Sequence, residues 1–280
     1  VSNTKWVREF SQPLWLGAGS LKDKTILLHA EQGLGDTIQF CRYVPLVAQL
    51  GAKVILEVQR PLGTLLDGLD GVQQIVAKGD ELPEFAYHCP LLSLPLAFQT
   101  APHTIPPTTQ HFASDEATAA KWRGLLGDKI KPRVGIVWSG NSDHKNDHNR
   151  SLTLSQLGPH LPSNVEYISL QKEIRDGDKE LLAQSSEIRD FSHALDDFKD
   201  TVALCELVDL VISVDTSVAH LAGTMGKPTW VLLPFSPDWR WLLDRDDTPW
   251  YPSAKLYRQE KYGDWQGVLQ RLEADLTRAL

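Results

Sequence analysis

Three polar residues at the end of an apolar run have the types and spacing of an anion site. Asp215, Thr216 and Ser217 follow residues 207–214, which are typical of a buried strand, and they open a helical pattern. A helix start carries free backbone N–H groups and the positive end of the helix dipole, so a phosphate or diphosphate can bind there. His220 lies one turn further on and can donate a hydrogen bond to the same anion. The alternative is an ordinary cap, because Asp, Thr and Ser are preferred N-cap residues and a helical histidine is often structural.

A second segment places two glycines before a carboxylate. Gly33 and Gly35 follow a predicted strand, and they let the chain turn tightly and bring backbone close to a ligand. Asp36 begins the next helix, where a carboxylate can act as general base toward an attacking hydroxyl group. Gln39 lies one turn further along, and we expect it with the two glycines on the acceptor side. The alternative for Asp36 is an N-cap role, and the motif is not a Walker loop because no Gly-Lys-Ser/Thr follows.

A long polar segment, residues 138–151, follows another predicted strand. It begins with Trp138 and Ser139, and it contains Lys145 and Arg150, two cations that can cancel charge on a phosphate leaving group. A solvated surface loop is the alternative. The segment also holds histidines and an aspartate, but no predicted helix fixes them on one face, so we expect no metal there.

Two further segments add cleft candidates. Gln171 and Lys172 end a predicted strand, and Lys172 can reach the same pocket as Arg150. The nearby Asp-Gly-Asp triplet at 176–178 has the form that some sugar transferases use for metal, but it lies in a charged run and is interpreted as a solvated turn.

The segment over 234–243 is rich in tryptophan. Trp239 and Trp241 can stack on a base or sugar, and Arg240 can pair with an anion. The alternative is that these side chains fasten the loop to the core.

The composition excludes several classes of protein. The chain has 280 residues, 42% of them hydrophobic and 23% charged, which is typical of a globular protein. The net charge of -8, without a Lys/Arg block, disfavours nucleic-acid binding. Three widely spaced cysteines argue against a disulfide framework and favour a reducing compartment, so we predict a cytoplasmic protein. No apolar run is long enough to span a membrane.

Strand-like and helix-like segments alternate along the chain. The predicted strands are residues 24–30, 54–58, 73–77, 133–138, 165–170, 207–214 and 229–233. The predicted helices are residues 37–50, 62–69, 115–126, 201–207 and 262–280, and a proline-rich loop covers 99–113. This alternation favours parallel sheets with crossover helices. Ligands of such sheets bind beyond the carboxyl ends of the strands, where Asp36 and Asp215 both lie.

The chain is predicted to form two α/β halves of similar size. Residues 127–132 have the composition of a linker, so we expect Rossmann-like domains over 1–128 and 132–261 that face a cleft. Apolar residues recur at helical spacing in 262–280, and we expect this terminal helix to pack back on the first domain.

These segments together resemble the ADP-heptose:lipopolysaccharide heptosyltransferase family. The matching stretches are residues 33–36, 135–140 and 214–221. The chain is most similar to the related glycosyltransferase-like domain at the C-terminus of bacterial tetratricopeptide-repeat proteins. That further similarity lies in residues 31–40, 237–241 and 248–252, and it extends over nearly the whole chain from about Trp15.

The resemblance implies a GT-B fold with the acceptor in the N-terminal domain and the donor nucleotide in the C-terminal domain. It implies metal-independent glycosyl transfer without a cofactor, with Asp36 as the base. Asp215, Thr216, Ser217 and His220 match the family's diphosphate-binding turn. Arg150 or Lys145 would supply the basic phosphate contact, but this loop differs from the heptosyltransferase pattern, so the donor stays open.

The function predicted from these residues and this resemblance is a hexosyl- or heptosyltransferase. Its partners would be a nucleotide-diphosphate sugar and a glycan, lipid-linked or protein acceptor, the acceptor being recruited by upstream repeats. Two alternatives remain: a non-catalytic nucleotide-sugar-binding or scaffold module, and a nucleotide-sugar epimerase, which would need further acid/base residues.

Overall fold

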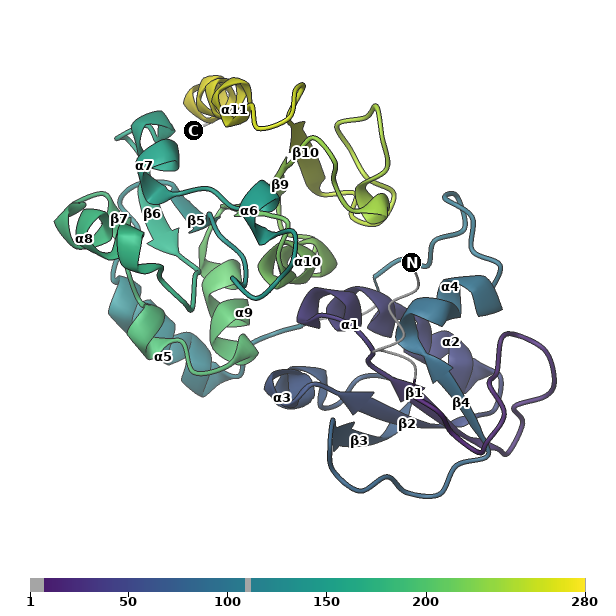
Figure 1. Ribbon diagram of the computed structural model, residues 1–280. Helices are drawn as coiled ribbons and strands as arrows, with labels where there is room; N and C mark the ends of the chain where they lie inside the picture. The colour runs from purple at the N-terminus through teal and green to yellow at the C-terminus, as the bar shows by residue number, and fades with distance from the viewer. Residues whose placement is uncertain (1–7, 109–111, 280) are drawn as a thin grey trace. The chain divides into compact units, whose positions relative to one another are not determined.

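The computed structural model describes residues 8–108 and 112–279. Residues 109–111 of the predicted loop and Leu280 of the predicted terminal helix lie outside the described residues. The chain divides into two compact units, Val1–Phe112 and Ala113–Leu280. Each unit is built around its own parallel sheet (Figure 1).

The first unit is a four-stranded parallel sheet with the order β3-β2-β1-β4. Its strands are β1 (Thr25–His29), β2 (Lys53–Val58), β3 (Val72–Ala77) and β4 (Tyr87–Pro90). Its α-helices are α1 (Leu34–Phe40), α2 (Val44–Gln49), α3 (Gly63–Leu66) and α4 (Leu94–Ala97). Short 3-10 turns join them at η2 (Cys41–Tyr43), η3 (Arg60–Leu62) and η4 (Leu91–Ser93). The helix predicted over 37–50 is therefore interrupted.

The second unit is a six-stranded parallel sheet with the order β10-β9-β8-β5-β6-β7. Its strands are β5 (Arg133–Val137), β6 (Glu166–Ser169), β7 (Ile188–Arg189), β8 (Leu210–Val214), β9 (Thr229–Leu233) and β10 (Ala254–Arg258). Its α-helices are α5 (Glu116–Leu126), α6 (Asp147–Arg150), α7 (Leu154–Leu157), α8 (Asp176–Gln184), α9 (Phe198–Leu207), α10 (Ser217–Thr224) and α11 (Trp265–Ala279). Its 3-10 turns are η5 (Gly158–His160), η6 (Ser192–Ala194) and η7 (Trp239–Trp241).

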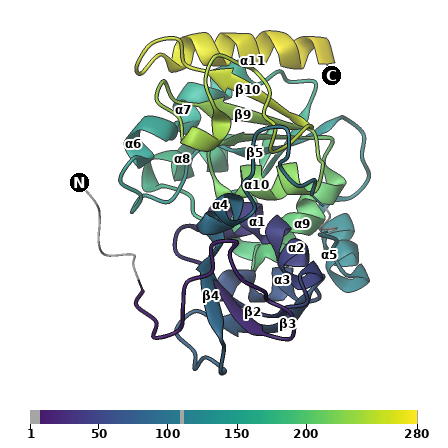
Figure 2. The same ribbon diagram turned by 90° about the vertical axis from the view of Figure 1, so that its right-hand side faces the viewer.

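Helices cover both faces of the second sheet because its strands are apolar on both faces. In β8, Val211 faces a cluster formed with α5, α9 and α10, while Ile212 faces a second cluster formed with α7, α8 and α11. The helices of this unit can be followed in Figures 1 and 2. Near-continuous apolar strands are typical of parallel sheets buried on both sides, so the doubly wound α/β architecture follows from the sequence pattern.

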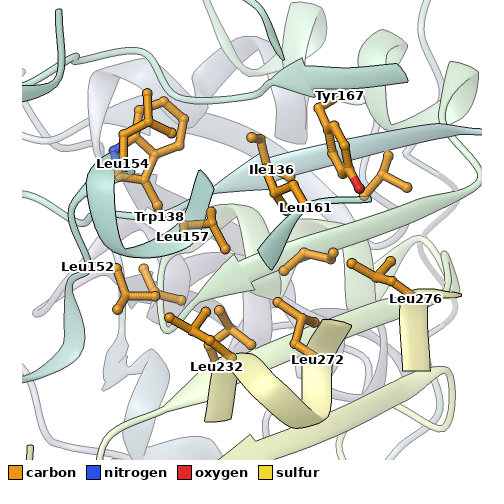
Figure 3. Packing of buried hydrophobic residues seen from close by; sticks show 14 of the residues in the cluster. Ile136, Trp138, Leu152, Leu154, Leu157, Leu161, Tyr167, Leu232, Leu272 and Leu276 are labelled. Atoms are coloured by element: carbon orange, nitrogen blue, oxygen red, sulfur yellow. The ribbon is translucent and has the colours of Figure 1, made fainter. Parts of the chain in front are cut away.

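Two helices lie elsewhere than the sequence predicted. Figure 3 shows Leu272 of α11 beside Leu232 of β9, in the cluster that also holds Ile136 and Tyr167. The terminal helix thus packs on the second sheet, and its expected place against the first domain is corrected. The helix α5 also belongs to the second unit, where Trp122 is fully buried and its Nε1 donates to Asp200 at 2.7 Å. The division therefore falls at Phe112/Ala113 and not near residue 130.

Within the described parts of the chain, no helix combines the length and the apolar character that crossing a membrane requires.

The packing of α11 predicts that Leu272→Ala destabilises the chain by about 2–5 kcal/mol, because a fully buried leucine would leave a cavity. Ile130→Ala is the control, since this side chain is 91% exposed and its loss should change stability by less than about 0.5 kcal/mol. Urea unfolding of both variants checks this. Equal stabilities would contradict the place of α11 in the core.

Candidate functional site

Each sheet contains a point at which the strand order reverses. In the second unit this point lies between β5 and β8. The strands that follow β5 continue toward one edge of the sheet as β6 and β7, and those that follow β8 continue toward the other edge as β9 and β10. In the first unit it lies between β1 and β4. Ligands of open α/β sheets bind beyond the carboxyl ends of the strands at such reversals. The segments that follow β5, β8 and β1 are the ones in which the sequence placed its candidate residues.

The turn after β8 leaves the start of α10 open to an anion. Thr216 is the N-cap residue in extended backbone conformation, but its side chain makes no capping hydrogen bond. Its Oγ1 lies instead 3.0 Å from the Ser213 hydroxyl. Ser217, the first helical residue, is partly exposed. The backbone N–H groups of the first turn therefore remain available, together with the positive end of the helix dipole.

Arg150 is held against this turn. Its Nη1 donates to the backbone carbonyl of Asp215 at 2.8 Å, and its Nε lies 3.6 Å from Oδ1 of Asp147. Gly140 makes this position possible, because a Cβ there would lie 2.5 Å from Nη2 of Arg150. The guanidinium of Arg150 thus lies against the residues that follow β8.

Asp215 and His220 form a buried wall behind the turn. Oδ1 of Asp215 lies 3.7 Å from Nε2 of His220, and Nδ1 of His220 is hydrogen-bonded to the Tyr251 hydroxyl at 2.9 Å. The His220 ring stacks on Trp241 with the ring centres 5.3 Å apart. Burial raises the pKa of Asp215 to about 6, and the Trp241 indole and Arg150 oppose this rise only in part. Tyr251 and Trp241 thus hold the His220 ring in place beside Asp215.

Three of the predicted donor residues shape the loop after β5 from inside. The Gln171 side-chain oxygen accepts from the backbone N–H groups of Trp138 and Ser139, both at 3.1 Å. Trp138 is fully buried and its Nε1 donates to Asp178 at 2.8 Å. Asp178 is therefore buried inside the unit, and it is not the solvated turn residue that the sequence suggested. These three side chains are buried and fix the conformation of the loop from beneath.

The two predicted lysines, Lys145 and Lys172, have different surroundings from Arg150. Lys145 is exposed. Nζ of Lys172 donates to the backbone carbonyls of Leu195 and of Ser192, in and next to η6. Arg150 differs from the two lysines because its guanidinium donates to the Asp215 carbonyl, and Arg240 also acts electrostatically on the Asp215 carboxyl.

The tryptophan-rich segment surrounds the same wall. Trp239 is 56% exposed and meets Trp250 edge to face, with the ring centres 6.1 Å apart. Arg240 is buried and its Nη1 donates to Asp238 at 2.6 Å. Trp241 is fully buried on His220, which agrees with the alternative in which this residue fastens the loop to the core.

In the first unit, the glycine turn holds its carboxylate as a cap. Oδ2 of Asp36 accepts from the backbone N–H of Gly33, the N-cap residue of α1, at 2.7 Å. Gly35 lies in the first turn of α1. Gln39 of the same helix is fully buried, and neither its amide oxygen nor its amide nitrogen has a hydrogen-bond partner within the described residues. The capping role of Asp36 and a role as base are compatible, because a carboxylate has further lone pairs.

Sequence reasoning missed Glu31. This residue follows β1 directly, and its Oε1 accepts from the backbone N–H of Leu92 at 3.1 Å, so it lies at the strand reversal between β1 and β4. Burial raises the pKa of Glu31 to about 7, and the charge of Asp36 adds to the rise. A carboxyl group that exchanges its proton near neutral pH, beside a candidate base, is a candidate acid/base group.

Over the described ranges, no group of three or more His, Cys, Asp or Glu side chains is arranged to hold a metal ion.

The fold is that of the GT-B-like glycosyltransferases. The glycosyl transferase family 9 structure from Veillonella parvula DSM 2008 superimposes with a TM-score of 0.62 at 10% identity, over 94% of this chain and 97% of that one. The Escherichia coli ADP-heptose lps heptosyltransferase II gives 0.61 at 13% identity, over 91% and 99%. The E. coli heptosyltransferase WaaC with ADP-2-deoxy-2-fluoro heptose gives 0.54 at 10% identity, over 91% and 100%. At these identities the likeness is one of fold.

In sequence, no family model matches the chain. Protein FlbA of Caulobacter vibrioides is 26% identical over 291 residues, which cover 94% of this chain and 48% of FlbA. The chain thus spans about half the length of this curated relative.

The close approach of Gly140 to Arg150 predicts that Gly140→Ala displaces the guanidinium. The free energy of unfolding of the variant should fall by about 1.5–3 kcal/mol, which is typical for the loss of a hydrogen bond to a charged group. Gly124→Ala, in α5, is the control: its Cβ meets nothing within 4 Å, and alanine should stabilise the helix by up to about 1 kcal/mol. Urea unfolding and a structure of the 140 variant test both, and an unmoved Arg150 would refute the argument.

The buried carboxyl of Glu31 predicts a pH dependence of stability. Because its pKa is about 7 in the folded chain and near 4.5 when exposed, the native state binds the extra proton and loses stability as pH rises between these values. Glu31→Gln removes this loss because glutamine does not ionise. As the pH rises from 4.5 to 8, the free energy of unfolding of the variant should therefore increase by about 1–3 kcal/mol relative to that of wild type. Glu81→Gln, at an exposed position, should show no such gain. A pH-independent difference would contradict the buried carboxyl.

Proposed function

We propose that this chain transfers a sugar from a nucleotide-diphosphate sugar to a hydroxyl acceptor without a metal ion. The observation that carries the proposal is the uncapped start of α10 with the Arg150 guanidinium fixed beside it at a strand reversal. A departing diphosphate needs donors and positive charge that are in place before the reaction. The α10 turn supplies N–H donors and a dipole, and Arg150 supplies a full charge.

In the proposed reaction, Asp36 takes the proton of the acceptor hydroxyl as general base. The acceptor oxygen then forms a bond to the anomeric carbon, and the bond from that carbon to the diphosphate oxygen breaks. The electron pair leaves with the diphosphate, whose charge the α10 turn and Arg150 offset. Glu31, with a pKa of about 7, can take up the proton that Asp36 carries.

Asp215 tunes this site toward an anion. Burial raises the pKa of Asp215 to about 6 because it disfavours the charged carboxylate. The negative charge of a bound diphosphate would raise this pKa further. In its protonated form the carboxyl can donate a hydrogen bond to a phosphate oxygen. Ser217 adds a hydroxyl donor from the same turn, whereas the Thr216 hydroxyl donates to Ser213, whose own proton goes to the Val214 carbonyl.

The fold likeness supports the same proposal. The solved relatives named above are glycosyl transferases or heptosyltransferases, and one of them was determined with an ADP-sugar analogue. ADP-sugars are therefore the first donors to test. A cytoplasmic location is proposed on the cysteine content, because three widely spaced cysteines do not have the pattern of a disulfide framework. The tetratricopeptide-repeat association remains a prediction of the resemblance alone.

Donor binding is tested by thermal shift with ADP, UDP, GDP, dTDP and CMP and with their sugars. A ligand that binds only the native state raises the melting temperature. Arg150→Ala should lower the affinity for the nucleotide that binds most tightly by about tenfold or more, because a charged contact is lost. Arg123→Ala, a half-exposed arginine on α5, should leave the affinity unchanged. If no nucleotide binds, the donor site is refuted.

Catalysis is tested separately with Asp36→Asn. Transfer should fall about 10²–10⁴-fold while the donor affinity stays that of wild type, since the base acts only on the acceptor. Asp70→Asn, an exposed acid of the same unit, is the matched control.

A non-catalytic donor-binding module is the second candidate, because the capping hydrogen bond gives Asp36 a structural reason to be present without catalysis. Nucleotide binding without transfer or hydrolysis would support this module. Product analysis with donor alone would reveal an epimerase.

A further inference from the structure

The second unit contains a pocket that the proposed reaction does not use. Its volume is about 510 Å³, within the range of small-molecule sites. It is lined by residues from the segment over 148–156, by Pro234 and Ser236 after β9, by residues from 259–265 after β10, and by Arg175 before α8. Its walls come from segments other than the α10 turn, so it is a separate cavity at the carboxyl ends of the strands.

The walls of this pocket carry no carboxylate. The chain has 36 acidic against 28 basic residues, yet Arg175 and His148 are the ionisable side chains of basic type in the lining, and Asp and Glu do not contribute to it. A cationic ligand would find no counter-charge there, whereas an anion would meet a guanidinium group.

The amide oxygens of two lining glutamines already accept hydrogen bonds inside the protein. The Gln259 side-chain oxygen accepts from the backbone N–H groups of Phe235 and Gly263 at 3.1 and 3.0 Å. The Gln156 oxygen accepts from the N–H of Thr153 at 2.9 Å. The amide nitrogen of Gln259 has no hydrogen-bond partner among the described residues, although Gln259 is only 5% exposed. Gln156 is exposed. The lining therefore offers donors to an incoming molecule.

Arg175 is fixed and remains partly available. Its Nη2 donates to Asp147, to the Gly140 carbonyl at 3.2 Å and to the Ser151 hydroxyl at 3.3 Å. Asp147 is also the carboxylate nearest Arg150, so one negative charge serves two guanidinium groups. The local charge beside the pocket is thus positive, and the remaining N–H groups of Arg175 make no hydrogen bond within the described ranges.

The pocket also has an aromatic wall. Tyr262 is 70% exposed, and its hydroxyl is held by Oδ1 of Asn149 at 2.5 Å. The buried Trp265 belongs to the same lining. Aromatic side chains of this kind pack against the apolar faces of sugar-sized molecules while their polar ends stay hydrogen-bonded.

We propose that this pocket binds a sugar-sized organic oxyanion, a sugar phosphate or a sugar carboxylate, at a site distinct from the α10 turn. The anionic group would face Arg175 and the amide N–H groups of Gln156 and Gln259, and the sugar ring would lie against Tyr262. This site does not depend on the proposed transfer reaction.

The test is isothermal titration calorimetry, in which the whole chain is titrated separately with glucose 6-phosphate, glucuronate, glucose and inorganic phosphate. Glucose 6-phosphate or glucuronate should bind at least tenfold more tightly than glucose or phosphate alone, and the better of the two identifies the anionic group. Excess ADP should leave this affinity unchanged. If neither sugar anion binds, or if ADP displaces it, the proposal is overturned.

Gln156→Glu is the decisive variant. It places a carboxylate in the donor lining, and it keeps the fold because Thr-x-x-Glu is as good a capping box as Thr-x-x-Gln. Affinity for the sugar anion should fall at least tenfold. Gln184→Glu, an exposed residue of α8, adds the same charge outside the pocket and should change the affinity less than twofold. Equal effects of the two variants would refute the site.

A failure of the donor experiment with sugar-anion binding intact would leave this inference standing. Nucleotide binding without sugar-anion binding would refute it and leave the proposed function intact.

Discussion

The contact between the Arg150 guanidinium and the carbonyl of Asp215 is the constraint on which the second unit's site depends. It joins the loop after β5 to the turn after β8, and these strands are neighbours only in space. The contact requires a glycine at position 140, because any Cβ would occupy the space of the guanidinium. Asp147 then links Arg150 to Arg175, so the α10 turn and the polar pocket share one carboxylate.

Burial decides which polar groups of the chain can do chemistry. Asp215 and Glu31 have raised pKa values because each carboxyl is largely removed from water at the end of a strand. His220 is kept in place by Tyr251 and Trp241, and Gly223 permits this because a Cβ there would lie 2.6 Å from the Tyr251 ring. A rigid wall of this kind holds its dipoles in position before a ligand arrives.

Much of the fold could be predicted because it depends on local pattern. The apolar runs of β5, β6, β8 and β9 are long and bounded by turn residues, and their alternation with helices fixes the parallel sheets. The strands β4, β7 and β10 were not predicted, and β7 is only two residues long. For β4 and β10 the reasons are local. One ends in Pro90, which is tolerated because β4 is at the edge of its sheet, and the other alternates apolar with charged residues.

The site was predictable where chemistry depends on position in the chain, as for the turn at Thr216. The site was not predictable where the partner of a long side chain lies far away in the sequence. Lys172 bonds to the Leu195 carbonyl, and no local pattern encodes that choice. Glu31 escaped notice because its burial depends on Leu92, which follows the strand that was missed. The packing of α5 and α11 likewise depends on tertiary contacts.

The placement of α5 has a consequence for biosynthesis. Trp122 is buried against α9, and its indole bonds to a residue 78 positions later in the chain. At a translation rate of roughly 5–20 residues per second, the helix leaves the ribosome on the order of ten seconds before its partner exists. During that interval a large apolar side chain on a short amphipathic helix is exposed. The core of the second unit on this face of its sheet can therefore form only after α9 has been synthesised.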